Sequence, residues 1–300
     1  MTIVVTGSSG LLGSALVRAL RADGDQVLRL VRREPAGPDE AFWDPARGVL
    51  DPAVLEGVDA VVHLAGAGIG DRRWTESYKR ELVDSRVNST RTLAEALAAL
   101  AGKPRVLLSG SAVGFYGDTG DRSVDESSPS GAGFLAGLVR EWEAAAAPAE
   151  EAGIRVVRLR TGIVLSGRGG ALAKVLPIFK LGAGAVLGSG KQYVSWISLP
   201  DWVAAIRFLL NNQEMSAMSG PVNVTAPEPV TNAEYTRAIG KALHRPTMPI
   251  ATPAFALRLA LGEFATEGVL AGQRVLPRRL LDAGHRFAHP ALEDALAAVL

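Results

Sequence analysis

A glycine-rich turn near the start of the chain has the spacing of a phosphate-binding loop. Gly7, Gly10 and Gly13 follow the apolar residues 3–5 and precede a run with helical periodicity. Glycines at this spacing let backbone N–H groups approach a diphosphate, and the positive end of the helix dipole favours the anion. Because strand, turn and helix occur in order, the pattern predicts a dinucleotide site; a tight turn without a ligand is the alternative.

The end of the second expected strand carries arginine where NAD-specific folds usually carry Asp or Glu. The sequence there is Val31-Arg32-Arg33, so no carboxylate is available for the ribose hydroxyls. A guanidinium suits the 2′-phosphate of NADP(H), because its planar donors can bond a phosphate bidentately. We therefore predict NADP(H) in preference to NAD(H). Solvated loop charges without a ligand are the alternative.

The elements that must position these residues alternate along the first half of the chain. We expect strands at residues 2–6, 26–31, 60–64, 105–109 and 156–159, and helices at residues 11–22, 75–100 and 134–151. Apolar strands separated by amphipathic helices are typical of a parallel sheet covered on both faces. The pattern predicts an α/β fold with a Rossmann-like, doubly wound sheet.

The rhythm changes after about residue 165, where segments rich in glycine and proline are followed by shorter helices. We predict an NADP-binding Rossmann domain at residues 1–165 and a smaller, mixed α/β substrate lobe at residues 166–300. Residues 195–225 are expected to return to the first sheet.

Composition excludes several other classes of protein. Lys and Arg number 32 against 31 Asp and Glu, giving a net charge of +1, so we expect no nucleic acid partner. No cysteine is present, and the four histidines lack metal-ligand spacing, so we expect no metal. No apolar run approaches the ~20 residues of a membrane span, and no secretory signal is visible. We expect a cytoplasmic protein with no membrane partner, either a monomer or a homodimer.

The motifs together resemble a known superfamily. The segments Thr6-Gly-Ser-Ser-Gly-Leu-Leu-Gly13, His63-Leu-Ala-Gly66 and Ser109-Gly-Ser-Ala-Val-Gly-Phe-Tyr-Gly117 are similar to those of the extended short-chain dehydrogenase/reductases. More closely, the chain resembles the atypical "epimerase family" branch of NAD(P)-dependent oxidoreductases and sugar epimerases. Segments such as Ser195-Trp196-Ile197 and Gln273-Arg274-Val275-Leu276-Pro277 extend the likeness over nearly the whole chain.

This resemblance implies a set of cofactor contacts. The residues expected at the pyrophosphate and its ribose are Gly7, Ser9, Gly10, Leu11 and Leu12. Those expected on the adenosine side are Val31 and Arg32, and those at the far ribose are Leu64, Ala65 and Gly66. Positions matching Glu81, Arg86, Ser109 and Val164 are also assigned to the cofactor in this branch. A surface ion pair is the alternative for Glu81 and Arg86.

The usual acid/base pair of the superfamily is missing. Active members carry Tyr-x-x-x-Lys on the helix after the fifth strand, and the matching residues here are Phe134 and Leu138. Ser111 and Tyr116 remain as candidate catalytic residues, Ser111 to orient a substrate carbonyl and Tyr116 to protonate it if a cation such as Arg86 lies close enough. A turn-forming serine and a packed aromatic ring are the alternatives.

Two functions follow from these observations. The first is an NADP(H)-dependent oxidoreductase or epimerase-like enzyme that acts on a small carbonyl or hydroxyl substrate, with a sugar nucleotide as one class. The second is an NADP(H)-binding regulatory or sensor protein that lost catalysis with the Tyr/Lys pair. The small-molecule substrate itself is not fixed by the likeness.

Overall fold

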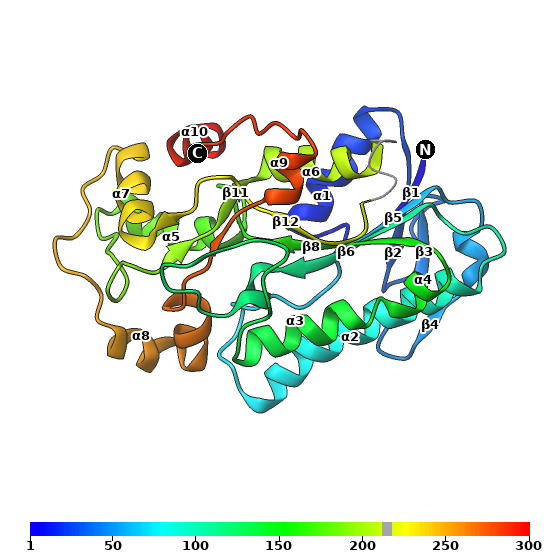
Figure 1. Cartoon of the computed structure of the whole chain (residues 1–300), viewed down its shortest axis with the longest axis horizontal. Helices are drawn as coiled ribbons and strands as arrows, with labels where there is room; N and C mark the ends of the chain where they lie inside the picture. Colours follow the sequence, from blue (N-terminus) through cyan, green and yellow to red (C-terminus); the bar gives the residue numbers. More distant parts are fainter. Residues whose placement is uncertain (212–217) are drawn as a thin grey trace.

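The computed structural model describes residues 1–211 and 218–300. Its main feature is an eight-stranded sheet with the strand order β12-β8-β6-β5-β1-β2-β3-β4 (Figure 1). Neighbouring strands are parallel except β3 and β4 at one edge. The strands are β1 (Thr2–Thr6), β2 (Gln26–Val31), β3 (Glu40–Asp44), β4 (Val49–Leu50), β5 (Ala60–His63), β6 (Val106–Ala112), β8 (Arg155–Thr161) and β12 (Gly220–Val224).

Helices cover both faces of this sheet (Figure 1). One face carries α1 (Leu11–Ala22) and α6 (Leu199–Asn211), and the other carries α2 (Glu76–Ala99), α3 (Phe134–Ala144) and α4 (Ala147–Glu151). The strands are apolar on both sides because each side is buried: Ile3 and Val5 pack toward α1, and Val4 between them packs toward α2. The chain therefore has the doubly wound α/β fold expected from its sequence.

The order of the strands reverses direction at β1. Strand β1 pairs with β2 on one side and with β5 on the other, and all three run in the same direction. Their carboxyl ends therefore meet at one edge of the sheet. Doubly wound sheets bind ligands at this edge, where the strand order reverses.

The later part of the chain builds a second cluster and also returns to the main sheet. Strand β12 pairs with β8, and α6 packs against α1. A separate core surrounds Leu176, Trp196, Ile239 and Leu296. Its elements are β9 (Ile163–Leu165), α5 (Gly170–Lys180), β10 (Tyr193–Val194), β11 (Trp196–Ser198), β13 (Val230–Thr231), α7 (Asn232–Ala242) and α10 (Leu292–Val299).

Two local features differ from the sequence-based expectation. The helix expected at residues 134–151 is divided into α3 and α4, and Pro148, which lacks a backbone N–H, lies in the first turn of α4. Strands β3 and β4 were not expected, because 40–50 has no strong period-two pattern to indicate them.

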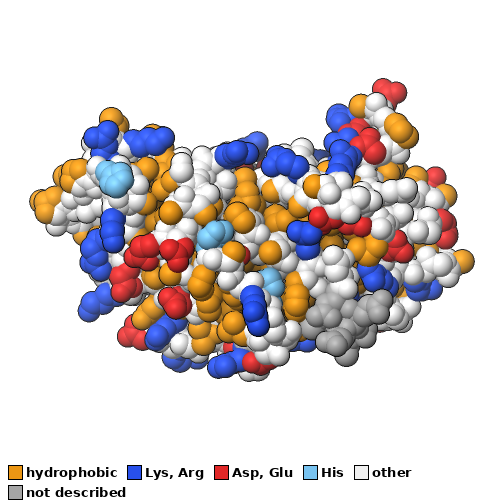
Figure 2. Space-filling model, turned by 90° about the horizontal axis from the view of Figure 1, so that it is seen from above, with side chains coloured by type: hydrophobic (Ala, Val, Ile, Leu, Met, Phe, Trp, Pro, Cys, Tyr) orange, Lys and Arg blue, Asp and Glu red, His pale blue; other side chains and the backbone are white. Residues whose placement is uncertain are grey.

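The distribution of charge on the surface and the hydropathy of the helices agree with the near-zero net charge and the ordinary apolar content of the sequence. Basic and acidic side chains are interspersed over the face seen from above in Figure 2. None of the helices among the described residues is long and apolar enough to cross a membrane.

Candidate active site

The glycine turn joins β1 to α1 and lies against the loop that follows β5. Gly7 has a φ of +63°, and a Cβ atom there would lie 2.7 Å from the carbonyl carbon of Leu64. A Cβ atom on Gly13 would lie 2.2 Å from the carbonyl oxygen of Gly7. Only glycine fits these two positions, because the backbones of the turn, the helix and the neighbouring loop approach so closely.

The start of α1 is open to an anion. Gly10 precedes the helix and provides no side-chain cap, and the first turn of α1 carries no acidic residue. Backbone N–H groups at a helix start need a partner, and the helix dipole makes that partner an anion by preference. Ser9 and Gly10 are exposed, and Leu11 and Leu12 are half-buried. The turn thus has the geometry that a pyrophosphate requires.

A buried threonine and histidine hold the loop that follows β5 in place. The Thr6 hydroxyl accepts hydrogen bonds from the backbone N–H groups of Leu64 (3.0 Å) and Ala65 (3.2 Å), and it lies 2.7 Å from Nδ1 of His63. His63 Nε2 lies 3.0 Å from the Thr90 hydroxyl. Burial lowers the pKa of His63 to about 3, so the ring is neutral and structural rather than a base.

The two arginines after β2 have different surroundings. Arg33 forms two hydrogen bonds with the carboxylate of Glu40, the first residue of β3. Arg32, immediately after Val31 at the end of β2, is exposed, and it forms no ion pair with any described residue. The guanidinium of Arg32 is therefore available at the position predicted for the adenosine side.

Two residues of α2 that were expected at the cofactor differ sharply in burial. Glu81 is exposed and pairs with Arg72 at 3.3 Å. Arg86 is buried against Gly66, and its guanidinium donates to the carbonyl oxygens of Leu82 (3.0 Å) and Ala67 (2.8 Å). Its Nε has no protein partner among the described residues, and burial lowers the pKa of Arg86 to about 10.

The remaining predicted cofactor residues lie on the neighbouring strands. Ser109 of β6 is buried, and its hydroxyl has no hydrogen-bond partner in the described part of the chain. Val164 of β9 is half-buried and packs against the main core. A Cβ atom on Gly169 or Gly170 would lie 3.3 Å from the side chain of Leu11, so the glycine-rich segment at the start of α5 lies next to the first residue of α1.

The two candidate catalytic hydroxyls belong to one buried polar network. Ser111 Oγ donates to Glu143 of α3 at 2.6 Å. Arg160 of β8 donates to both oxygens of Glu143 at 2.8 and 2.9 Å, and to the Tyr116 hydroxyl at 3.1 Å. The Tyr116 hydroxyl in turn donates to the side-chain oxygen of Asn223 at 2.7 Å. The cation beside Tyr116 is therefore Arg160, not Arg86.

The surroundings of Tyr116 in this network disfavour loss of its phenolic proton. Its side chain is 2% exposed, and burial raises the pKa of the phenol, although the positive charge of Arg160 acts in the opposite direction. The guanidinium of Arg160 also lies 3.4 Å from the centre of the Phe115 ring. Packing and hydrogen bonding thus hold all members of the network in place.

Helix α3 begins where the usual catalytic tyrosine would stand. Phe134 is its first residue and packs edge-on against Trp74, with ring centres 5.1 Å apart. Leu138, one turn later, is 2% exposed and belongs to the apolar cluster between α2 and α3. Helix α3 contains neither tyrosine nor lysine. Both positions are therefore occupied by packing residues.

The start of α3 is capped from the far end of the chain. The two carboxylate oxygens of Glu267 accept hydrogen bonds from the backbone N–H groups of Phe134 (2.9 Å) and Leu135 (2.8 Å). Glu267 lies in a short π-helical segment (Ala265–Val269) that follows α8 (Ala254–Leu261). The capping carboxylate also satisfies the positive end of the helix.

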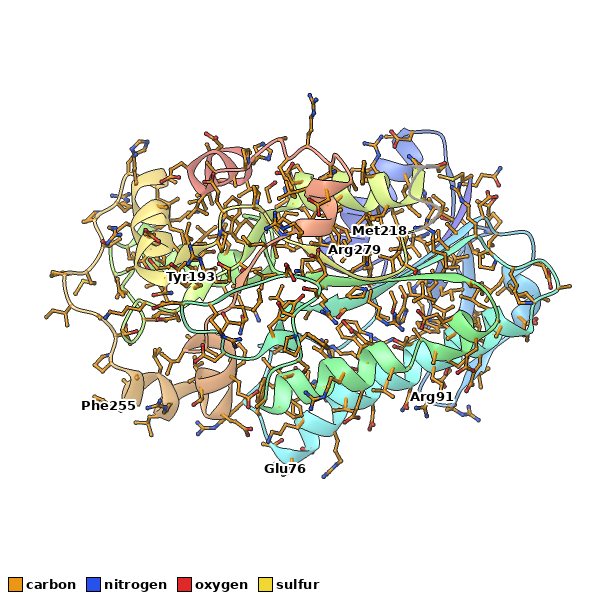
Figure 3. The ribbon with its side chains drawn as sticks, viewed as in Figure 1. Glu76, Arg91, Tyr193, Met218, Phe255 and Arg279 are labelled. Atoms are coloured by element: carbon orange, nitrogen blue, oxygen red, sulfur yellow. The ribbon has the colours of Figure 1, made fainter. Side chains whose placement is uncertain are left out.

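The same C-terminal region connects the loop after β6 to β10 and to the segment just before β11. Strand β14 (Arg274–Val275) pairs with β7 (Ser123–Val124) of the loop after β6. The backbone N–H of Gln273 donates to the carbonyl of Tyr193 in β10, which Figure 3 marks. Ser195 closes the junction by donating to the carbonyl of Gln273 and accepting from the N–H of Val275.

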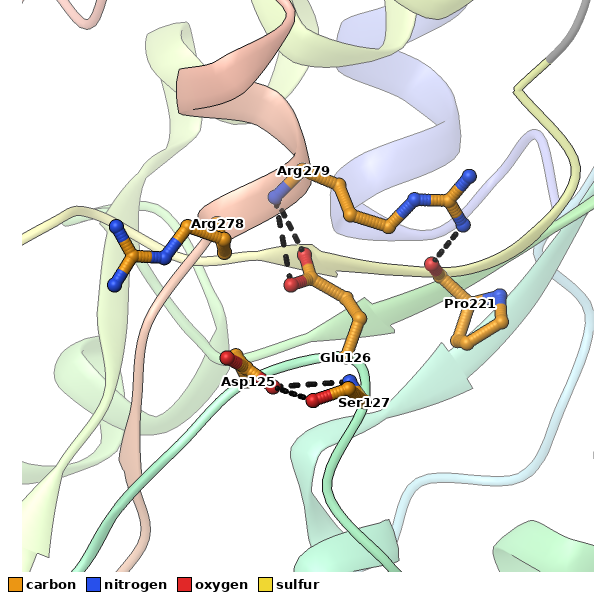
Figure 4. A pocket seen from close by; sticks show the side chains of 6 residues that line it. All are labelled: Asp125, Glu126, Ser127, Pro221, Arg278 and Arg279. Carbon is orange, nitrogen blue, oxygen red and sulfur yellow. Dashed lines mark hydrogen bonds between the residues drawn. The ribbon is translucent and has the colours of Figure 1, made fainter.

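A separate pocket of about 430 Å³ lies at the outer edge of β12 and is shown in Figure 4. Glu126 accepts a hydrogen bond from the backbone N–H of Asn223 at 3.0 Å, and the side chain of Arg279 donates to the carbonyl of Pro221 at 2.7 Å. These side chains satisfy polar groups on the open side of an edge strand, where another strand would otherwise pair. The pocket is lined by Asp125, Glu126, Ser127, Pro221, Arg278 and Arg279.

Some residues of the site could not be recognised from the sequence. Glu143 lies in an alanine-rich helix and Glu267 in an irregular segment, so neither has a local pattern that indicates its partner. Arg158 and Arg160 did carry a signal, because they alternate with apolar residues in a strand that is otherwise apolar. Charges on one face of a central strand require a buried partner.

Comparison with known proteins places this geometry in a family. Residues 3–225 match the model of the NAD dependent epimerase/dehydratase family. The chain belongs to that family. Residues 252–299 match a domain of unknown function. This second match includes Glu267 and β14, the region that caps α3 and pairs with β7.

Relatives and solved structures cover the whole length of the chain. The epimerase family protein Mb2239 of Mycobacterium bovis is 51% identical over 98% of this chain and 96% of its own length. The crystal structure of human epimerase family protein SDR39U1 (isoform 2) with NADPH is 33% identical, with a TM-score of 0.89, covering 100% of this chain and 99% of that one. The nucleoside-diphosphate sugar epimerase from Corynebacterium glutamicum is 36% identical, with a TM-score of 0.82, covering 100% of this chain and 58% of that one.

The chain thus has the NAD(P)-dependent epimerase-family fold, of the atypical short-chain dehydrogenase/reductase kind. Its glycine turn, its free arginine after β2 and its uncapped α1 are the features of this chain that fit a dinucleotide.

Proposed function

We propose that the protein is an NADP(H)-dependent oxidoreductase or epimerase-like enzyme that acts on a small carbonyl or hydroxyl compound. The observation that carries the proposal is the uncapped start of α1 beside the glycine turn, with the exposed Arg32 at the end of the adjacent strand. Together they offer helix N–H groups to a pyrophosphate and a guanidinium to a 2′-phosphate.

The remaining cofactor contacts follow the predicted positions. Gly7, Ser9, Gly10, Leu11 and Leu12 would contact the pyrophosphate and its ribose. Val31 and Arg32 would contact the adenosine side, and Leu64, Ala65 and Gly66 would contact the far ribose. Glu81, Arg86, Ser109 and Val164 complete the proposed set. The Nε of Arg86 and the hydroxyl of Ser109, for which residues 1–211 and 218–300 provide no hydrogen-bond partner, support it, because buried polar groups need partners.

Bound NADP(H) would supply the hydride chemistry, and this chain would supply position and proton control. We assign Ser111 and Tyr116 as the residues nearest the substrate. The Ser111 hydroxyl uses its hydrogen to donate to Glu143. Only the lone pairs of its oxygen would remain for a ligand, so Ser111 could accept a hydrogen bond from the ligand but not donate one. Tyr116 would exchange a proton only if substrate binding weakened its bonds to Arg160 and Asn223.

A sugar nucleotide is one substrate class to test first. The relative from Corynebacterium glutamicum is described as a nucleoside-diphosphate sugar epimerase. The small molecule would bind beyond the carboxyl ends of the strands, between the sheet and the second lobe. Its identity, reaction direction and stereochemistry would come from a substrate panel.

The second candidate is a regulatory or sensor protein that binds NADP(H) without consuming it. The observation that favours it is the start of α3, where Phe134 packs on Trp74 and Leu138 is buried. Neither side chain can donate or accept a proton. The engagement of Ser111 and Tyr116 in a closed network points in the same direction.

The two candidates are separated by following NADPH absorbance over a panel of carbonyls and nucleotide sugars, after any dinucleotide that copurifies with the protein is identified. Turnover that is abolished in Ser111→Ala or Tyr116→Phe would support the enzyme and the assigned residues. Full turnover in Tyr116→Phe would remove the proton-donor role. Tight NADPH binding without turnover of any compound would favour the sensor.

A further inference from the structure

A buried carboxylate lies directly behind the arginine pair at the end of β2. Glu40 begins β3, and its backbone pairs in parallel register with Arg29 of β2. Its side chain is only 1% exposed. The carboxylate therefore sits beside the loop of residues 32–36, which must wrap the adenosine end of a dinucleotide bound at the glycine turn.

Protein groups already occupy both oxygens of this carboxylate. Arg33 donates from its two terminal nitrogens to Oε1 and Oε2, each at 2.7 Å. The backbone N–H of Ala36 donates to Oε2 at 2.7 Å, and Arg29 lies 3.0 Å from Oε1. The hydrogen bonds from Arg33 hold the pKa of Glu40 below its ordinary value, so the group stays ionised.

This arrangement separates the roles of two adjacent arginines. Arg33 is turned to Glu40 and to the carbonyl of Glu34, whereas Arg32 is exposed and has no ion-pair partner among the described residues. A carboxylate that is free near an adenosine ribose binds its hydroxyls and repels a 2′-phosphate. With Arg33 in place, Glu40 can do neither.

We propose that the Arg33–Glu40 pair sets the preference of the site for NADP(H), by occupying a carboxylate beside the 32–36 loop that would otherwise favour NAD(H), and by leaving Arg32 to the 2′-phosphate. This inference rests on the proposed dinucleotide function. In it Arg33 and Glu40 are positioning residues, and of these three residues only Arg32 is expected to touch the cofactor.

The test compares dissociation constants for NADPH and NADH by titration calorimetry, so that no substrate is needed. The variants are Arg33→Ala, which removes the bidentate partner of Glu40 and leaves only Arg29 and the Ala36 N–H beside it, and the double variant Arg33→Ala/Glu40→Ala, which removes both charges. Arg47→Ala is the matched control, because Arg47 is an exposed arginine on the turn between β3 and β4 and its loss changes the net charge by the same amount as that of Arg33.

We expect Arg33→Ala to weaken NADPH binding by about tenfold or more while NADH binding is unchanged or tighter. The double variant should recover NADPH affinity to within about threefold of the wild type, because the repelling carboxylate is gone. Arg47→Ala should leave both constants unchanged. Thermal unfolding of each variant reports whether the fold is intact, and Glu40→Gln replaces Glu40→Ala if the latter does not fold.

The outcomes distinguish this inference from the function on which it rests. If the wild type binds neither dinucleotide, the proposed function fails and the inference fails with it. If the wild type binds NADPH but Arg33→Ala weakens both dinucleotides equally, or the double variant recovers nothing, the role of Glu40 is overturned while the dinucleotide site stands.

Discussion

The Ser111 hydroxyl donates a hydrogen bond of 2.6 Å to the Glu143 carboxylate, which ties the end of β6 to the C-terminal turn of α3. Glu143 is also the buried counter-ion of Arg160, and both side chains are at most 10% exposed. A serine that was expected either to orient a substrate carbonyl or to form a turn is thus anchored to an ion pair inside the protein. The energetics of that pair can be tested without knowing the substrate.

We expect Glu143→Gln to destabilise the fold by about 3–5 kcal/mol, because Arg160 would keep its charge in a buried site without a counter-ion. Urea unfolding measures the change in the free energy of unfolding. Glu141→Gln is the control, since Glu141 is an exposed carboxylate on the same helix. A loss below about 1 kcal/mol would show that the Arg160 charge is solvated, contrary to the burial described here.

The buried ring of His63 should make stability fall in mild acid. Its pKa is about 3 in the folded protein and near 6.5 when unfolded, so between these values only the unfolded state takes up the proton. This contribution is complete above pH 6.5 and is lost as the pH falls towards 3, with a slope of about 1.4 kcal/mol per pH unit. His63→Asn should lack that component.

The measurement is the free energy of unfolding at several pH values for wild type and His63→Asn. The buried His285, whose pKa burial also lowers, contributes in the same direction to both proteins. The difference between the two curves therefore isolates His63. Parallel curves would mean that His63 is protonated in the folded state.

Because Glu267 caps α3, two substitutions of Glu267 should reduce stability by different amounts. Glu267→Ala should cost about 0.5–2 kcal/mol, because two backbone N–H groups lose their acceptor. Glu267→Gln keeps one oxygen acceptor for one of the two N–H groups and loses the second acceptor and the charge at the helix start, so it should cost less than Glu267→Ala. Hydrogen exchange at the Phe134 and Leu135 amides should accelerate in both. Glu263→Gln, which breaks an exposed ion pair with Lys79, is the control.

Introducing the tyrosine and the lysine of the usual catalytic pair should change stability by different amounts at the two positions. Phe134→Tyr adds one hydroxyl to a half-buried ring at the start of α3 and should change stability by less than about 1 kcal/mol. Leu138→Lys places a charge in the apolar cluster between α2 and α3, and several kcal/mol of stability should be lost. Comparable melting temperatures for the two variants would contradict the packing of Leu138.

The site residues on β6 and α3 show most clearly what could not be predicted from the sequence. Ser111 and Tyr116 were recognised by their place in a motif, but the motif did not indicate where their hydroxyls point. Their partners Glu143, Arg160 and Asn223 are 32, 44 and 107 residues away in sequence from the hydroxyls they contact. Such contacts form only when strands and helices pack, so no local pattern encodes them.

The parallel sheet, the glycine turn and the arginine after β2 could all be predicted from residue types and their order along the chain. These features depend on residue period, on the close backbone approach that only glycine permits, and on adjacency along the chain. Tertiary structure alone decided which of two neighbouring arginines is free, because the choice belongs to Glu40 on the next strand. It also decided that residue 267 caps a helix starting at residue 134, since hydrogen bonds and charges act through space whatever the separation along the chain.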